Sequence, residues 1–184
     1  MSQDAPSVGA MKIFGLAGWS GSGKTTLITR LIPELVGRGL RVSTMKHAHH
    51  GFDMDEEGKD SFEHRRSGAQ EVLITSARRW ALMHELRNAE EPEIEELIGR
   101  MTPVDLLLIE GFKRQSHAKL EVYRAAVGKP LLCLDDPQIV AVASDGPLQD
   151  LTADLPLLDL NDIEAIADFI IKRCGLTAVA RGAA

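Results

Sequence analysis

The chain has 184 residues, 44% of them hydrophobic and 26% charged, which is the size and composition of one ordinary globular domain. Its formal net charge of −6 argues against a protein that binds nucleic acid through a basic face. The sequence has no apolar run near the roughly 18 residues of a membrane helix, no signal-peptide pattern in residues 1–10 and no zinc spacing at Cys133 and Cys174. We therefore expect a cytoplasmic protein that binds neither membrane nor nucleic acid, with both cysteines buried as free thiols.

Strand and helix patterns alternate along residues 11–176, which predicts a single α/β domain with a mainly parallel sheet. The polar ends, residues 1–10 and 177–184, are expected to be disordered. The predicted strands cover residues 13–17, 42–45, 72–75, 80–83, 104–109, 131–134 and 139–143. The predicted helices cover residues 26–36, 61–68, 93–101 and a last helix that Asn161 caps, with Glu164 at the capping-box position and Gly175 after the end.

The first predicted strand leads into a segment with the G-x-x-x-x-G-K-[ST] spacing of a P-loop, residues 18–25. Glycines let such a loop curl so that its N–H groups point at phosphate oxygens, and the following helix adds the positive end of its dipole. Lys24 is predicted to reach the β- and γ-phosphates and the Thr25 hydroxyl to hold magnesium. The alternative is a glycine-rich turn without a ligand. The predicted nucleotide-binding residues here are Gly18, Ser20, Gly21, Ser22, Gly23, Lys24, Thr25 and Thr26.

A P-loop needs a carboxylate near its metal, at the end of a neighbouring strand. Residues 104–109 are almost continuously apolar, which is typical of a central strand buried on both faces. Glu110 follows this strand, and Gly111 would let the backbone pass close to a ligand. We predict that Glu110 holds magnesium, directly or through water. Asp105 begins the same strand at the end remote from ligands and is expected to cap or pair structurally.

A polar loop rich in histidine and aspartate follows the second predicted strand. Its candidate substrate or partner residues are Lys46, His47, His49, His50, Asp53 and Asp60. The histidine spacing would suit zinc or nickel, an anionic substrate, an interface, or only a polar surface. The loop leaves the sheet edge at which α/β proteins place their ligands, which favours a functional role.

Further charged residues lie beside these segments. Arg65 and Arg66 could pair with phosphates or with the aspartates at 53 and 55, or form a solvated helix face. Lys113 and Arg114 are candidate anion-binding residues just past the predicted magnesium carboxylate. The candidate catalytic residues are Lys24, Glu110 and Asp60, the last of which would orient water or bind magnesium through water, as Asp53 also could. No glutamine stands next to the P-loop, so we expect slow hydrolysis.

These segments together resemble the MobB family, the GTP-binding proteins of molybdopterin guanine dinucleotide biosynthesis. The resemblance runs from about residue 11 to residue 174 and is carried by the P-loop and by K-H-x-H-H at 46–50, G-K-D-S at 58–61, R-x-x-G-A at 65–69 and I-E-G-F-K at 109–113. It implies a three-layer P-loop NTPase fold related to the dethiobiotin synthetase-like GTPases, a homodimer, and weak GTPase activity. It also implies partnership with the guanylyltransferase that attaches GMP to molybdopterin, with molybdopterin as a further candidate ligand.

The chain departs from the family pattern at two positions, where Glu57 replaces a frequent proline and Ser67 a frequent alanine. Both changes affect local geometry rather than the identity of the family. The N-K-x-D motif that reads guanine in Ras-like GTPases is absent. Asp145, after a late strand, is the candidate to accept the N1 and N2 protons of guanine, although Ser-Asp-Gly-Pro at 144–147 would equally form a simple turn.

Two other functions are compatible with a P-loop. A metallochaperone GTPase would carry nickel on His47, His49 and His50, although such proteins usually add cysteine ligands and an N-K-x-D motif. A small-molecule kinase would need an arginine-rich lid, for which only Arg65 and Arg66 are candidates.

Overall fold

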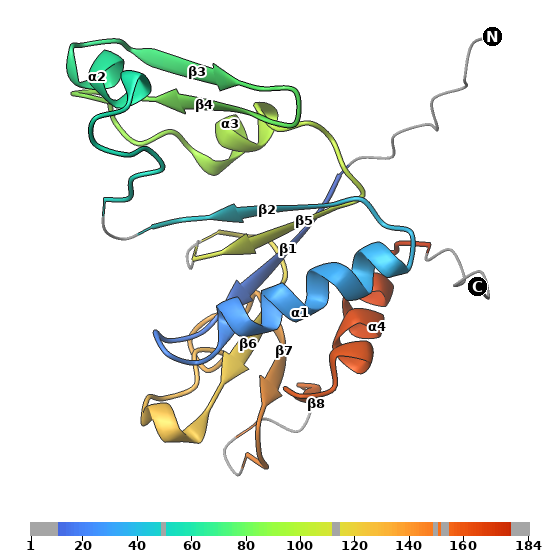
Figure 1. Cartoon of the computed structure of the whole chain (residues 1–184). Helices are drawn as coiled ribbons and strands as arrows, with labels where there is room; N and C mark the ends of the chain where they lie inside the picture. Colours follow the sequence, from blue (N-terminus) through green and yellow to red (C-terminus); the bar gives the residue numbers. More distant parts are fainter. Residues whose placement is uncertain (1–10, 49–50, 112–114, 149–150, 152–154, 178–184) are drawn as a thin grey trace, which may run out of the picture. The chain divides into compact units, whose positions relative to one another are not determined.

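The computed structural model describes residues 11–48, 51–111, 115–148, 151 and 155–177 (Figure 1). Where the sequence predicts a single domain, the chain divides into two compact units, Met1–His47 with Pro103–Ala184, and Ala48–Thr102. The second unit corresponds to the polar loop and the elements that follow it, so it is an insertion between two strands of the first. The ends predicted to be disordered lie outside the described residues, except for Thr177.

A six-stranded sheet with the order β2-β5-β1-β6-β7-β8 forms the first unit, and every neighbouring pair is parallel. The predicted α/β class with a mainly parallel sheet is confirmed. Because the strands are parallel, their carboxyl ends share one edge of the sheet, where ligands of such folds bind. The strands are β1 (Lys12–Ala17), β2 (Val42–Lys46), β5 (Leu106–Glu110), β6 (Lys119–Tyr123), β7 (Ile139–Ser144) and β8 (Leu157–Asp159).

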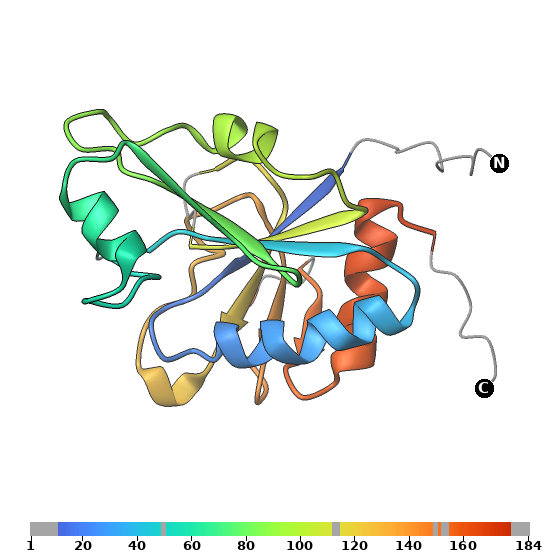
Figure 2. The same cartoon turned by 45° about the horizontal axis from the view of Figure 1, so that its top comes forward.

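Two helices, α1 (Lys24–Gly37) and α4 (Ile163–Cys174), pack against each other on one face of this sheet (Figures 1 and 2). Leucines at helical spacing on α1 point into the core, and Phe14 of β1 meets Phe169 of α4 edge-on with ring centroids 6.5 Å apart. All four residues at 106–109 of β5 are buried. Because alternate side chains of a strand point to opposite faces of the sheet, this confirms that the strand is covered on both faces.

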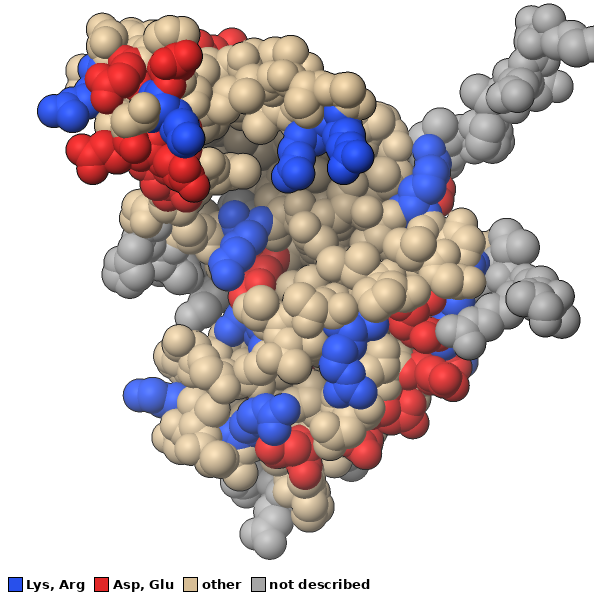
Figure 3. Space-filling model, in the orientation of Figure 1, with Lys and Arg blue, Asp and Glu red and all other residues tan. Residues whose placement is uncertain are grey.

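The second unit contains α2 (Asp60–Arg66), the antiparallel pair β3 (Glu71–Thr75) and β4 (Trp80–His84), and α3 (Ile94–Gly99). Figure 3 shows acidic side chains gathered around α2 with basic ones among them, as expected for a solvated helix face. Among the described helices of the whole chain, none combines the length and hydropathy that crossing a bilayer requires.

The strand predicted at 131–134 is wrong, because this segment forms a turn that a buried carboxylate holds. Glu121 of β6 is fully buried, and its two oxygens accept hydrogen bonds from the N–H groups of Leu132 and Cys133, both at 2.8 Å. Lys119, also buried, donates to Asp136 at 2.9 Å. Two backbone N–H groups of this segment are therefore satisfied by the Glu121 side chain instead of by a neighbouring strand.

Two further differences concern the end of the chain and the cysteines. The N-cap of α4 is Asp162, which accepts from the N–H of Ala165 at 3.0 Å, so the prediction of Asn161 as the cap was wrong by one position and no capping box forms. Both cysteines are free, as expected, but only partly buried, and burial raises the pKa of the Cys133 thiol to about 11.

Candidate functional site

The glycine-rich loop between β1 and α1 has a backbone that only glycine allows at two key positions. Gly18 has a φ of 146°, and a Cβ there would lie 2.5 Å from the carbonyl oxygen of Val122. Gly23 has a φ of 97° and is the N-cap of α1, so the helix begins directly at Lys24. The loop thus ends at a helix N-terminus, where unpaired N–H groups and the helix dipole favour an anion.

The side chain of Lys24 folds back over this loop. Its Nζ donates to the carbonyl oxygens of Gly18 and Trp19, at 2.9 Å each. The indole of Trp19 in turn donates to the carbonyl oxygen of Pro130 at 2.8 Å, which ties the loop to the turn after β6. A positive charge is therefore held within reach of the loop backbone, as binding of a phosphate group requires.

Ser22 lies in the middle of the loop and is 2% exposed. Its hydroxyl oxygen is buried and makes no hydrogen bond within the described residues. Buried polar atoms are nearly always paired, so a partnerless hydroxyl in this loop is the kind of group that a ligand satisfies. The curled backbone, the ammonium group and this hydroxyl fit the phosphates of a nucleotide. Ser20, Gly21, Thr25 and Thr26, the other predicted loop residues, lie in the same loop or the first turn of α1.

The predicted magnesium ligands emerge at the same edge of the sheet. Glu110 ends β5, pairs in register with Leu16 of β1 and with Lys46 of β2, and is half-buried. Thr25 is exposed in the first turn of α1. A hydroxyl and a carboxylate are hard oxygen ligands of the kind magnesium takes, usually together with waters. These residues fit the ion, and their role in holding it stays a prediction.

Asp145 directly follows β7 and lies beside an open pocket of about 340 Å³. The pocket is lined by polar and apolar residues, namely Ser144, Asp145, Gly146, Pro147, Leu157, Leu158, Asp159 and Asn161. Asp145 forms an ion pair with Arg124, whose Nη1 lies 2.8 Å from Oδ2. Arg124 is absent from the residues predicted from the sequence, although the alternation of polar and apolar residues in β6, the strand that it follows, is a signal that could have located it.

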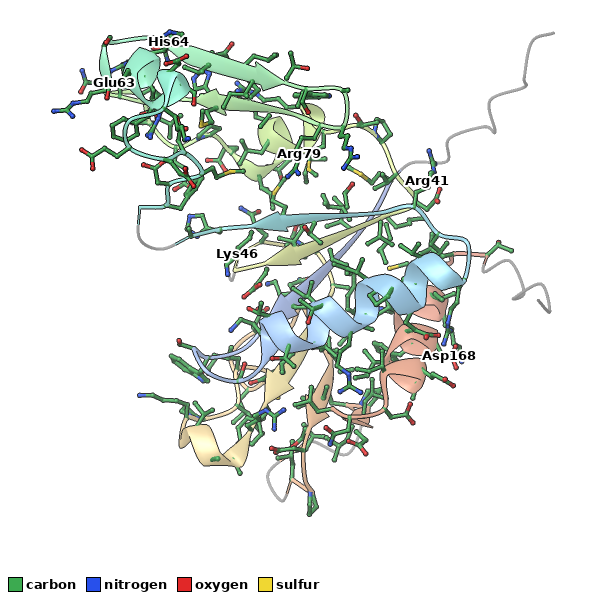
Figure 4. The ribbon with its side chains drawn as sticks, viewed as in Figure 1. Arg41, Lys46, Glu63, His64, Arg79 and Asp168 are labelled. Carbon is green, nitrogen blue, oxygen red and sulfur yellow. The ribbon has the colours of Figure 1, made fainter. Side chains whose placement is uncertain are left out.

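Residues of the polar loop divide between the two units. Lys46 ends β2 (Figure 4). The N–H of His47 donates to the main-chain carbonyl oxygen of Glu110 at 2.9 Å, which joins the start of this loop to the backbone of the residue that carries the predicted magnesium carboxylate. The other loop histidines and the cations after Gly111, namely His49, His50, Lys113 and Arg114, lie outside the described residues. Within the described chain, no group of three or more His, Cys, Asp or Glu residues could hold a metal ion.

Arg65 of the second unit pairs with carboxylates of its own unit, one of the outcomes that the sequence left open. Its Nη2 lies 2.8 Å from Asp53, and its Nη1 lies 3.3 Å from Glu85. The hydrogen bond from Arg65 lowers the pKa of the Asp53 carboxyl. Asp55 accepts from the hydroxyl of Ser61 at 2.8 Å. This network organises the segment before α2. Asp60 is the first residue of α2 and is exposed.

Asp105 has the structural role that the sequence predicted. It lies just before β5, at the end of the sheet opposite to Glu110, and pairs with Arg41 at 2.8 Å. Figure 4 places Arg41 and Lys46 at opposite ends of β2. The Arg41 guanidinium and backbone N–H lower the pKa of the Asp105 carboxyl.

Comparisons with known proteins agree on one family. Residues 13–145 match the family model MobB, described as molybdopterin guanine dinucleotide synthesis protein B. The chain is 44% identical over 163 residues to the molybdopterin-guanine dinucleotide biosynthesis adapter protein of Escherichia coli (strain K12), covering 87% of this chain and 91% of that protein. It is 42% identical over 158 residues to the protein of the same name from Haemophilus influenzae (strain ATCC 51907 / DSM 11121 / KW20 / Rd), with 86% of each chain covered.

Solved structures share the fold of this chain. A crystal structure of molybdopterin-guanine biosynthesis protein B superposes with a TM-score of 0.69 at 30% identity, covering 88% of this chain and 99% of that one. The crystal structure of Bacillus subtilis MobB, at 23% identity, also gives a TM-score of 0.69, covers 89% of this chain and 98% of that one, and supports the fold.

Proposed function

The chain belongs to the MobB family, and from that premise we propose that it is a GTP-binding adapter protein of molybdopterin guanine dinucleotide biosynthesis that assists the guanylyltransferase of this pathway. The observation that carries GTP binding is the loop at 18–25, in which Lys24 lies within hydrogen-bond distance of the loop carbonyls. The named relatives, which are adapter proteins of the same biosynthesis, support the pathway.

In the proposed complex, each part of the loop has a distinct role toward the triphosphate. The N–H groups after Gly18 bind phosphate oxygens, and Lys24 exchanges its contacts with loop carbonyls for contacts with the β- and γ-phosphates. Thr25 and Glu110 would hold magnesium, which when bound neutralises phosphate charge. These residues position the triphosphate and neutralise its charge, and none of them activates the attacking water.

We propose that Asp145 recognises the guanine base. A carboxylate can accept hydrogen bonds from both N1–H and the N2 amino group of guanine, whereas adenine presents an acceptor at N1. The pocket beside Asp145 is open and has room for the edge of a base, with Leu157 and Leu158 as apolar contacts. Arg124 engages Oδ2 of this carboxylate, and an oxygen atom of a carboxylate can accept more than one hydrogen bond.

Replacing Asp145 with asparagine should therefore reduce the preference for GTP over ATP and make xanthosine triphosphate a better ligand. Loss of a charge-assisted contact to the base corresponds to about 1.5–3 kcal/mol, roughly ten- to a hundredfold in affinity. Competition titrations with the three triphosphates measure this. An unchanged GTP/ATP ratio would show that other groups read the base.

We propose that the chain forms a homodimer through its second unit. In the antiparallel pair, Leu73, Leu82 and Trp80 share one face, and they are 59%, 47% and 67% exposed. An isolated two-stranded sheet is marginally stable, and a cluster of exposed large apolar side chains on it is typical of an interface.

Changing Leu82 to lysine should shift the chain from dimer to monomer in light scattering after size exclusion. The matched control is Leu134→Lys, since Leu134 of the first unit is similarly exposed, at 56%. A wild-type chain that stays monomeric at all concentrations would contradict the dimer.

A further inference from the structure

Arg124 makes two separate contacts at the ligand edge of the sheet. Its Nε donates to the carbonyl oxygen of Ser22 at 3.2 Å, and its Nη1 lies 2.8 Å from Oδ2 of Asp145. The guanidinium also lies against Gly23, where a Cβ would be 3.2 Å from Nε. One side chain thus contacts both the predicted phosphate loop and the predicted base-recognition residue.

The sheet order explains how one arginine spans these groups. β6 lies between β1 and β7, so a residue that follows β6 stands between the loop after β1 and the turn after β7. A guanidinium carries donors on three nitrogen atoms in a planar fork, so it can donate to two separated acceptors at once. A lysine ammonium carries all its donors on one nitrogen atom and cannot reproduce this geometry.

The contact with Ser22 bears on the phosphate loop. In a trans peptide the C=O and the N–H point in opposite directions. A hydrogen bond from Arg124 to the Ser22 carbonyl therefore directs the N–H of Gly23 away from the guanidinium. The Asp145 side chain is 32% exposed, and its contact with Arg124 holds the carboxylate in one orientation. Loss of Arg124 would release both groups.

We propose that Arg124 is a positioning residue that couples recognition of the base by Asp145 to the conformation of the phosphate loop. This inference rests on the proposed binding of GTP. It adds a mutual dependence: a chain without Arg124 should bind the phosphates more weakly and also discriminate less between bases, although Arg124 itself need not contact either part of the nucleotide.

The test uses Arg124→Gln, Arg124→Lys and the double variant Arg124→Gln/Asp145→Asn in the full chain. The matched control is Arg41→Gln, which breaks another arginine–aspartate pair at 2.8 Å at the opposite end of the sheet. The ligands are GTP, ATP and inorganic tripolyphosphate, which has no base and reports on the loop alone. Urea denaturation of each variant separates a loss of stability from a loss of binding.

We expect Arg124→Gln to weaken tripolyphosphate binding and to reduce the GTP/ATP ratio, each by about tenfold, with Arg41→Gln unchanged in both. Adding Asp145→Asn to Arg124→Gln should lower the ratio little further, because the two residues act as a unit. Arg124→Lys keeps the charge but not the planar fork, so it should not restore the GTP/ATP affinity ratio.

Three results would overturn parts of this proposal, and they are distinguishable. A wild-type chain that binds neither GTP nor tripolyphosphate overturns the proposed function and the inference with it. A wild-type chain that prefers GTP, combined with an Arg124→Gln variant that keeps the ratio and the tripolyphosphate affinity, overturns the inference alone. Strictly additive effects of the two substitutions on the GTP/ATP ratio would overturn the coupling.

Discussion

Replacing Lys24 with alanine should abolish measurable binding of GTP and ATP while leaving the fold intact. The ammonium group donates to two loop carbonyls, and the side chain lies at the edge of the core rather than in it. In a complex it would face two phosphates, and each charge-assisted hydrogen bond contributes about 1.5–3 kcal/mol. The expected loss is therefore at least roughly a hundredfold in affinity.

Isothermal titration with GTP measures the affinity, and urea denaturation measures the free energy of unfolding. Lys12→Ala is the matched control, because Lys12 is an exposed lysine at the opposite end of the strand that leads into the loop. Because the substitution removes two part-buried hydrogen bonds to loop carbonyls, the free energy of unfolding of the Lys24→Ala variant should fall by about 1–3 kcal/mol, and the variant should stay folded. If it bound GTP as tightly as wild type, the loop would not be the phosphate site.

The isolated chain should hydrolyse GTP slowly, below about one turnover per minute, and a pathway partner should accelerate it. The loop supplies positioning and charge neutralisation, and an arginine supplied by a partner adds about 10³–10⁵ in rate in comparable GTPases. Arg65, a candidate arginine from this chain, is already engaged by Asp53 and Glu85. Asp60 and Asp53 remain the predicted water-orienting residues.

Steady-state release of phosphate, with and without the guanylyltransferase or molybdopterin, measures both parts of this prediction. The Lys24→Ala variant in the same assay reports contaminating phosphatases. Fast turnover by the chain alone would contradict an adapter role and favour a self-sufficient enzyme.

The parts of the fold that could be predicted from the sequence are those with strong local patterns. The glycine spacing at 18–25 and the apolar run before Glu110 predicted the loop, its strand and the central β5, and parallel pairing then brought both to one edge. The alternation of strands and helices predicted the class. These signals need no knowledge of distant contacts.

The strand β6 is absent from the predicted strands although its sequence, Lys119–Tyr123, alternates polar and apolar residues as a half-buried strand does; what this alternation does not predict is the burial of its charged residues. Lys119 and Glu121 are both buried, since Asp136 and the turn at 132–133 satisfy them. Those partners lie more than ten residues away along the chain, and only the folded structure brings them together. Missing β6 also meant missing Arg124, which links the loop to Asp145.

The proposed function depends above all on the binding of GTP in preference to ATP. Titration of the wild-type chain with each nucleotide, once with magnesium and once with a chelator, measures this preference. We expect saturable binding of one GTP per chain, about tenfold or more tighter than ATP, in keeping with a charge-assisted contact to the base, and weaker when magnesium is removed. Absence of GTP binding at millimolar concentration, or equal affinity for the two nucleotides, would contradict it.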